Sequence, residues 1–141
     1  MFLGEYLHSI DEKGRLTLPA KFKDAYADGL VVSEGFEESL ALFTMVDWPK
    51  EAEKFRELES FDPDNRMLRR GFFAGADILT PDKNGRVVIP GSMRESIGLE
   101  KEAYIIGVYD HLEVWPKAKW DQYRSQARKT REVHAKRLAQ K

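Results

Sequence analysis

Apolar and polar residues alternate with a period of two in several short stretches of the chain, which is typical of half-buried strands. The stretches fall into two similar sets, one in each half of the sequence. The expected strands are residues 5–10, 15–18, 30–33 and 39–44 in the first half, and residues 77–79, 86–89, 103–107 and 111–115 in the second. The pattern therefore predicts two units of four strands.

Between the second and third strands of each unit, the apolar spacing changes to that of a short helix. A Pro precedes each helical run and a Gly follows it, which suits a helix entrance and a helix end. The residues concerned are Pro19, Phe22, Ala25, Tyr26 and Gly29 in the first unit, and Pro90, Met93, Ile97 and Gly98 in the second.

Longer helices are expected outside the two units. Residues 49–60 place Ala52, Phe55 and Leu58 on one stripe, and the Asp-Pro-Asp sequence at 62–64 ends that helix. Residues 65–75 are expected to form a second helix. The tail from 117 to about 139 is predicted as one long polar helix, because it has neither a breaker nor an apolar stripe.

One nine-residue motif occurs twice, as DEKGRLTLP at residues 11–19 and as DKNGRVVIP at residues 82–90. A second match, LALFTMVDW at 40–48 with LEVWPKAKW at 112–120, keeps almost the same offset. We therefore divide the chain into a first repeat (5–48), a helical linker (49–76), a second repeat (77–120) and a basic C-terminal helix (121–141). A four-stranded unit leaves sheet edges open, so the two repeats are expected to pair as one body.

The motif has a clear local interpretation. Its Gly can adopt a positive φ at a sharp reversal, and its Asp can accept hydrogen bonds from backbone N–H groups two residues on. In the strand that follows, Leu16 and Leu18 share one face, as do Val87 and Ile89. Arg15 and Arg86 then lie on the opposite face, pointing away from the core, with Lys13 and Lys83 nearby.

Two roles for these arginines remain open at this point. An exposed guanidinium on a stiff hairpin suits phosphate oxygens or the edge of a guanine. The same guanidinium could instead pair with a nearby carboxylate, such as the Asp of its own motif, and only hold the turn. The presence of the motif in two copies does not distinguish these two roles, because a purely structural turn would also be repeated.

The doubled motif resembles the swapped-hairpin AbrB (SpoVT-AbrB) type of DNA-binding domain. Three segments are similar to the bacterial MraZ family: MFLGEYLHSIDEKGRLTLPAKF, FFAGADILTPDKNGRVVIP and GLEKEAYIIGVYDHLEVW. The resemblance implies a mixed α/β fold, mainly β, in which two tandem AbrB-like swapped-hairpin repeats form one pseudo-twofold, barrel-like body with flanking helices.

The resemblance also implies a function. The protein would be a cytoplasmic, nucleoid-associated, sequence-specific regulator of transcription, expected as a repressor of the division and cell-wall gene cluster that includes its own gene. It would bind short direct repeats in double-stranded promoter DNA as a ring of about eight to twelve subunits. The DNA-contacting residues carried over by position are Lys13, Gly14 and Arg15 in the first turn, and Lys83, Asn84, Gly85 and Arg86 in the second.

Charge is distributed unevenly although the net charge is only −1. Residues 117–141 hold nine Lys or Arg against two acidic residues, so the rest of the chain is acidic. A balanced total therefore does not exclude a polyanionic partner. The basic helix has three interpretations: a solvated face, an arm on a neighbouring subunit, or an additional phosphate-binding surface. Its charges are spread around the helix, which favours the first two.

The residues give little support to catalysis. There is no Cys, and His8, His111 and His134 are scattered without the spacing of metal ligands. Ser9 and Ser33 lack the context of a nucleophile elbow. We expect no enzyme, metal, cofactor or small-molecule substrate, and no membrane span or signal peptide.

Two further alternatives were weighed. An antitoxin-like protein-binding module could use the same turn, although such proteins usually carry one copy and an acidic tail. The aromatic residues Trp48, Phe72, Phe73, Trp115 and Trp120 are interpreted as core, with a contact between repeats or subunits as the alternative.

Overall fold

The protein is described here by a computed structural model that covers residues 1–141 and contains eight strands, four α-helices and two 3₁₀ helices. The strands are β1 (Glu5–Ser9), β2 (Arg15–Thr17), β3 (Leu30–Glu34), β4 (Leu40–Thr44), β5 (Ala76–Leu79), β6 (Arg86–Val88), β7 (Glu102–Gly107) and β8 (Leu112–Pro116). The helices are η1 (Ala20–Phe22), η2 (Asp24–Tyr26), α1 (Trp48–Arg56), α2 (Pro63–Ala74), α3 (Gly91–Ile97) and α4 (Lys117–Ala139). All eight predicted strands are present, with ends that differ by at most one residue.

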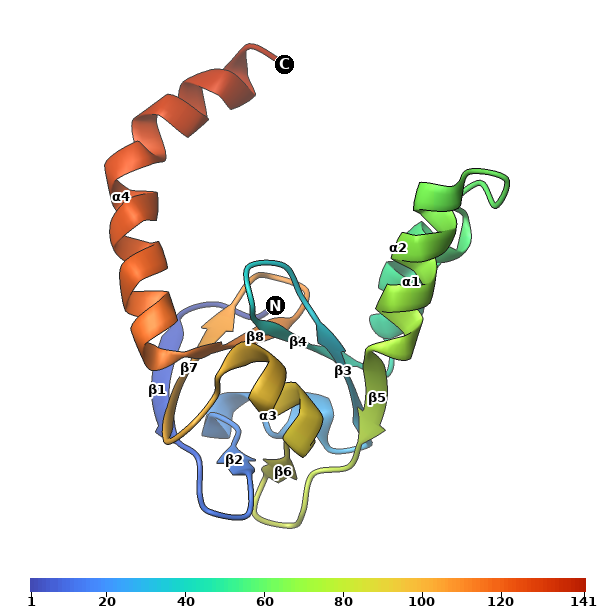
Figure 1. Cartoon of the computed structure of the whole chain (residues 1–141). Coiled ribbons are helices and arrows are strands. Elements are labelled where there is room, and N and C mark those ends of the chain that lie inside the picture. Colours follow the sequence, from blue (N-terminus) through green and yellow to red (C-terminus); the bar gives the residue numbers. More distant parts are fainter.

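Six strands form one antiparallel sheet in the order β1-β7-β8-β4-β3-β5, and β2 and β6 pair separately (Figure 1). β1 of the first repeat pairs with β7 of the second, and β5 of the second pairs with β3 of the first. Each repeat thus gives its first strand to the hairpin of the other. If the two repeats are exchanged, the strand order reads the same from the opposite edge, so the expectation that the repeats pair with each other is confirmed.

The strand pairing does not show the barrel closure expected from the sequence. The two sheets are hydrogen-bonded separately, and a single bridge between Ile10 and Leu16 connects β2 to the strand-like segment after β1. The mixed α/β class is confirmed, with a six-stranded antiparallel sheet as its main element.

The core lies between the six-stranded sheet and the layer formed by β2, β6 and the short helices. Leu16, Val87 and Ile89 are fully buried in it, and Leu18 is 1 % exposed, as the period of two predicted. Burial of each such side chain contributes about 1.5–3 kcal/mol. Tyr26 is buried as well, and its hydroxyl donates to the carbonyl of Leu42 at 2.7 Å, which satisfies the polar atom.

The first short helix differs from the expectation in type. Residues 20–26 form two 3₁₀ turns closed by i to i+3 hydrogen bonds, such as Phe22 N–H to the Pro19 carbonyl at 2.9 Å. Runs of three or four residues are the usual length of 3₁₀ helices, and this arrangement still buries both Phe22 and Tyr26. The equivalent segment in the second repeat is the α-helix α3, which ends at Gly98 with φ 71°.

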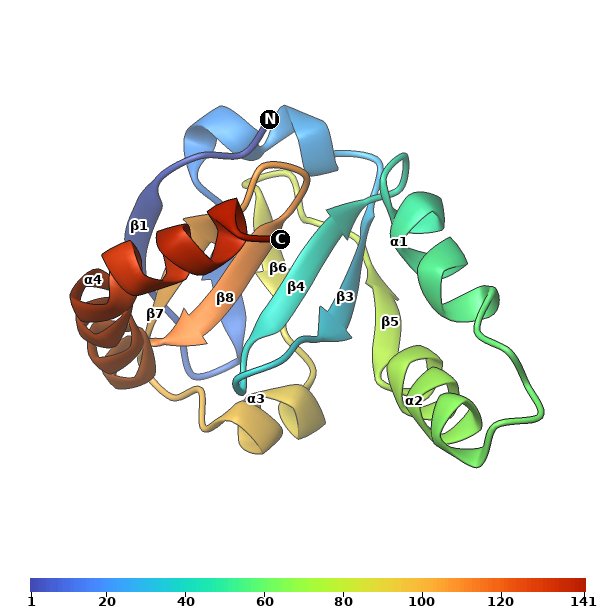
Figure 2. The same cartoon turned by 90° about the horizontal axis from the view of Figure 1, so that it is seen from above.

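The remaining helices lie on the outer face of the sheet. α1 and α2 form a hairpin near the β5 edge of the sheet, where Phe55 and Phe72 stack with ring centroids 3.6 Å apart. α4 begins near the other edge, where Trp120 and Tyr123 pack on Trp115. Seen from above, the two sets of helices stand on either side of β8, β4 and β3 (Figure 2). None of the helices is long and apolar enough to cross a bilayer.

The aromatic residues follow the core interpretation only in part. Trp115 is buried, at 3 % exposure, in the outer layer of the sheet. Trp48, Phe72 and Trp120 are half-buried between helices and sheet, and Phe73 is exposed. The outer face therefore carries a second, less complete apolar layer.

Candidate nucleic-acid interface

The first turn is held by the side chain of Asp11. Its Oδ1 accepts hydrogen bonds from the backbone N–H groups of Lys13 and Arg15, both at 2.9 Å. Its Oδ2 accepts from Nε of Arg15 at 2.5 Å. Gly14 has a φ of 79°, and its N–H donates to the Asp11 carbonyl at 3.0 Å. The Asp and the Gly of the motif therefore do what the sequence predicted.

The second turn repeats this geometry with the equivalent residues. Oδ1 of Asp82 accepts from the N–H groups of Asn84 and Arg86 at 2.9 and 3.0 Å, and Oδ2 accepts from Nε of Arg86 at 2.8 Å. Gly85 has a φ of 74°. The side chains of Lys83 and Asn84 are exposed and make no hydrogen bond within the chain.

Main-chain hydrogen bonds fasten the two turns to each other. The N–H of Leu18 donates to the carbonyl of Gly85, and the N–H of Ile89 donates to the carbonyl of Gly14, both at 2.9 Å. The pairing of β2 with β6 lies between these bonds, with Leu16 opposite Val87. The turns consequently lie side by side at one end of the molecule (Figure 1).

A basic residue of each repeat packs on the turn of the other. A Cβ placed on Gly14 would lie 2.7 Å from Cζ and Nε of Arg94, and one placed on Gly85 would lie 2.6 Å from Cδ and Cε of Lys23. Arg94 is held in place because its Nε donates to the carbonyl of Ile89 at 3.0 Å. Lys23 and Arg94 occupy equivalent positions, 71 residues apart.

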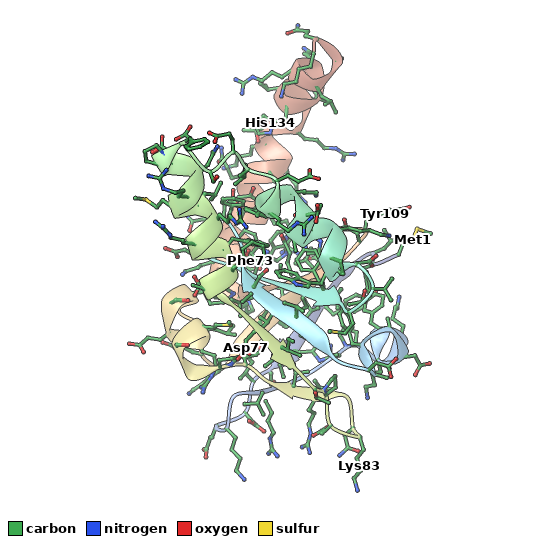
Figure 3. All side chains as sticks on the ribbon, turned by 90° about the vertical axis from the view of Figure 1, so that its right-hand side faces the viewer. Met1, Phe73, Asp77, Lys83, Tyr109 and His134 are labelled. Carbon is green, nitrogen blue, oxygen red and sulfur yellow. The ribbon has the colours of Figure 1, made fainter.

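Together the turns and the residues packed on them make one basic surface, which we call the turn face. Its basic residues are Lys13, Arg15, Lys23, Lys83, Arg86 and Arg94, and its acidic residues are Asp11, Glu12 and Asp82. Figure 3 shows Lys83 extending away from the body, at the end opposite to His134 of α4. The turn face is therefore a net positive surface on one projecting end.

Both carboxylates of the turns stay ionised. The backbone hydrogen bond from Arg15, aided by its side chain, holds the pKa of Asp11 below its usual value, and Arg86 does the same for the pKa of Asp82. Because these pKa values are lowered in the folded state, the stabilisation that they give is present above the unfolded-state pKa and is lost as the pH falls through the folded one.

The two roles considered for the arginines prove compatible in this geometry. Each ion pair within the chain uses Nε, and neither Nη1 nor Nη2 of Arg15 or Arg86 makes a hydrogen bond within the chain. The carboxylate thus holds the guanidinium at Nε and leaves Nη1 and Nη2, which form its outer end, available to a ligand. Two parallel N–H groups on that end match the acceptors of a phosphate or of a guanine edge.

Sequence reasoning identified seven residues of this surface and missed two. The structure brings together Lys13, Gly14, Arg15, Lys83, Asn84, Gly85 and Arg86 on neighbouring turns. It adds Lys23 and Arg94, which follow the motif by four residues in both copies. Their shared basic character at one offset was a usable signal, but their packing across repeats was not visible in the sequence.

The fold and this surface define a class of protein: two intertwined repeats that present a pair of fastened basic turns. Residues 1–71 and 72–141 each match one family model, described as "MraZ protein, putative antitoxin-like". The second match begins 71 residues after the first, the same offset that separates the two motifs.

Individual relatives agree with the family model. A "Transcriptional regulator MraZ" of Acetivibrio thermocellus is 40% identical over 139 residues, which cover 99% of this chain and 97% of the relative. Proteins of the same name from Thermomicrobium roseum and Herpetosiphon aurantiacus are 41% and 42% identical over 120 residues, covering 85% of this chain and 84% of each relative. The chain belongs to the MraZ family, whose members are named as regulators of transcription and not as enzymes.

Proposed function

We propose that this protein is a sequence-specific, DNA-binding regulator of transcription that contacts one duplex with both turns. The observation that carries the proposal is the mutual fastening of the turns through the carbonyls of Gly14 and Gly85. It presents Lys13, Arg15 and Arg86 in a fixed relation to one another, so that little conformational entropy is lost on binding.

The residues of the turn face have separate roles in this proposal. Lys13 and Lys83 bind phosphate oxygens, while Arg15 and Arg86 read guanine through the open ends of their guanidinium groups. One good bidentate contact of this kind gives about 1–3 kcal/mol of discrimination between bases. Lys13 stands directly before Gly14 and Arg15, where the second turn has Asn84, so the first turn places a cation beside its arginine and is the principal reader. The second turn has Lys83 where the first has Glu12, which gives it the larger net charge and a supporting role in binding phosphates.

One subunit offers few contacts, so the proposal includes assembly. A ring of about eight to twelve subunits repeats the turn face at a regular spacing and engages short direct repeats in a promoter together, and such linked contacts multiply affinity through effective concentration. In line with the family resemblance, we further propose that the protein represses the division and cell-wall gene cluster that includes its own gene, and that it acts at the nucleoid in the cytoplasm.

The divisions of the chain are part of the same proposal. Residues 5–48 and 77–120 are the SpoVT-AbrB-type repeats, joined by a linker at 49–76 and followed by a basic helix at 121–141. The two repeats act as one barrel-like body. The exchange of β1 and β5 between the repeats supports this, because neither repeat completes its own sheet.

A second candidate is an antitoxin-like module that binds a protein, which the family description "putative antitoxin-like" favours. The doubled turn and the basic tail weigh against it. A partner protein would be expected to cover the turn face with acidic side chains in place of phosphates, and competition between such a protein and DNA would distinguish the two.

The experiment that tests the proposal uses Lys13→Ala and Lys83→Ala, because neither side chain makes a hydrogen bond within the chain and the turns stay intact. Binding to a repeat-bearing promoter duplex is measured at several salt concentrations. Each lost phosphate contact should weaken binding and reduce the salt slope by about 0.9. Lys50→Ala, on α1 away from the turns, is the control and should change neither quantity.

Base reading is tested by Arg15→Lys and Arg15→Ala, with thermal unfolding measured in parallel. Lys keeps the charge but loses the parallel N–H pair, so affinity for the promoter should fall while binding to unrelated DNA is kept. Full affinity and an unchanged salt slope in the Lys13→Ala Lys83→Ala double variant would show that the turn face is not the DNA-binding surface.

A further inference from the structure

An apolar groove of about 570 Å³ lies on the outer face of the sheet, beside the α1–α2 hairpin. Its floor includes Phe43 of β4, and its wall includes Phe55 of α1 and Phe72 of α2. Phe36 and Met67 at its rim are exposed by 70 % and 74 %. Large apolar side chains gathered at this level of exposure mark an interaction site.

The groove is also acidic. Its acidic lining residues are Glu34, Glu37, Glu51 and Glu113, and no Lys or Arg lines it. His111 lines it as well, with Nε2 3.8 Å from a carboxylate oxygen of Glu113, so the acidic excess comes from the other three carboxylates. Glu37 makes no hydrogen bond or ion pair within the chain, and the ion pair of Glu51 with Lys54, at 3.4 Å, is exposed. A partner that fits the groove must therefore combine positive charge with some apolar surface.

The far half of α4 has that composition and no partner within the chain. The near half is anchored, since Glu5 accepts hydrogen bonds from Trp120 Nε1 at 2.6 Å and from Arg124. Beyond that point residues 131–141 are all exposed, including Val133 at 49 % and Leu138 at 72 %. Residues 125–141 carry six basic residues and one acidic residue, Glu132.

This half of the helix is not an extension of the turn face. It rises from the sheet at the end of the molecule opposite to the turns (Figures 1 and 3), and it stands apart from the α1–α2 hairpin that lines the groove (Figure 1). The helical part of this segment, residues 125–139, is about 22 Å long, which is enough to reach a neighbouring molecule. A helix that is polar all round and projects in this way is typical of an element that bridges to a second body.

We propose that residues 125–141 of one subunit dock in the acidic, apolar groove of the next subunit. The proposal rests on the homo-oligomer of the proposed function and assigns its contact. Five net positive charges on the helix face four carboxylates in the groove, and Leu138 or Val133 enters among the Phe side chains. Each subunit gives one helix and accepts one, which is a head-to-tail contact of the kind that closes into rings.

The absence of Cys from the chain makes a cross-linking test specific. Leu138→Cys and Met67→Cys are made in separate chains, one of them enlarged by a tag, and the two are mixed under mild oxidation. A disulfide between the two different chains is the expected product. Leu138→Cys mixed with Val88→Cys, which is exposed on the turn face, is the matched control and should give less than a tenth of that product.

Charge reversal tests the electrostatic part in the full chain. Glu37→Lys with Glu51→Lys should raise the dissociation constant of the assembly at least tenfold, as measured by sedimentation. When Arg131→Glu and Lys136→Glu are added to the chain that carries these two substitutions, assembly should be restored. Glu100→Lys, an exposed acidic residue outside the groove, should leave it unchanged. Circular dichroism checks that each variant is folded.

The outcomes separate this inference from the proposed function. If the wild-type protein assembles and binds promoter DNA but the Leu138→Cys and Met67→Cys chains give no disulfide between them, the groove assignment is wrong while the ring of the proposed function is retained. If the disulfide of a chain carrying both Cys substitutions forms within single monomers, the helix covers its own groove and the inference is overturned. A wild-type protein that stays monomeric overturns both.

Discussion

The side chain of Lys23 packs directly on Gly85, which belongs to the other repeat, and leaves no space for a Cβ atom on Gly85. In the same way, Arg94 of the second repeat packs on Gly14 of the first repeat. Both glycines also have positive φ values, 79° for Gly14 and 74° for Gly85. Each turn therefore requires Gly for its backbone and uses that Gly to admit a basic side chain from the other repeat.

Gly85→Ala is expected to lower the free energy of unfolding by about 1–2 kcal/mol, the cost of a left-handed backbone for a residue with a Cβ. The clash with Lys23 should add little, because the end of a lysine side chain can move aside. Urea unfolding of Gly85→Ala in the wild-type background and in a Lys23→Ala background checks this. If Gly85→Ala does not lower the free energy of unfolding in the Lys23→Ala background, then Gly is required at this position because of the contact with Lys23 and not because of the positive φ.

Leu16→Ala is expected to cost about 2–5 kcal/mol, because Leu16 is fully buried and stands opposite Val87 where β2 meets β6. The same pairing fastens the two turns, so affinity for promoter DNA should fall even under conditions where the variant remains folded. Chemical unfolding and a binding titration on the same sample measure the two effects.

The control for this loss is Val88→Ala in the same strand. Val88 lies opposite Arg15 in the register but is 53 % exposed, so its truncation should change stability by no more than about 0.5 kcal/mol. Equal losses in Leu16→Ala and Val88→Ala would contradict the assignment of the core to one face of these strands.

Much of the fold could be predicted from the sequence, because its signals are local. The period of two in Leu16 and Leu18 fixes which face of β2 is buried, and Gly14 fixes where the chain turns. The repeat itself shows that two incomplete units are present. These features depend on neighbouring residues and on one offset, both of which can be read directly.

The rest depends on contacts between distant segments. That β1 belongs to the hairpin of the second repeat, and that Lys23 reaches Gly85, follows from the way the repeats intertwine, which no local pattern encodes. The groove beside the α1–α2 hairpin was missed for the same reason. Phe72 was interpreted as a core residue and Phe55 as part of a helical stripe, but the two helices meet the sheet only at its margin and leave both side chains half-buried.

His111 is stacked on the ring of Phe43 at 4.4 Å on the outer face of the sheet. Burial lowers its pKa, but the carboxylate of Glu113, 3.8 Å from Nε2, and the hydrogen bond of Nδ1 with Asp110 at 2.7 Å outweigh burial and raise the pKa above its usual value. A raised pKa means that the folded state binds the proton more tightly than the unfolded state. The resulting stabilisation is fully present below the unfolded-state pKa and is lost as the pH rises through the folded one.

The free energy of unfolding of the wild type minus that of His111→Gln should therefore decrease as the pH is raised from about 5.5 to 8.5, the range in which imidazole titrates. The difference between variants is needed because burial lowers the pKa of His8, which adds a slope of opposite sign to both proteins. Asp110→Asn should reduce the His111 contribution and lower its pKa, measured by NMR titration of the imidazole. A difference that is flat or rises with pH would show that the carboxylates do not hold the proton on His111.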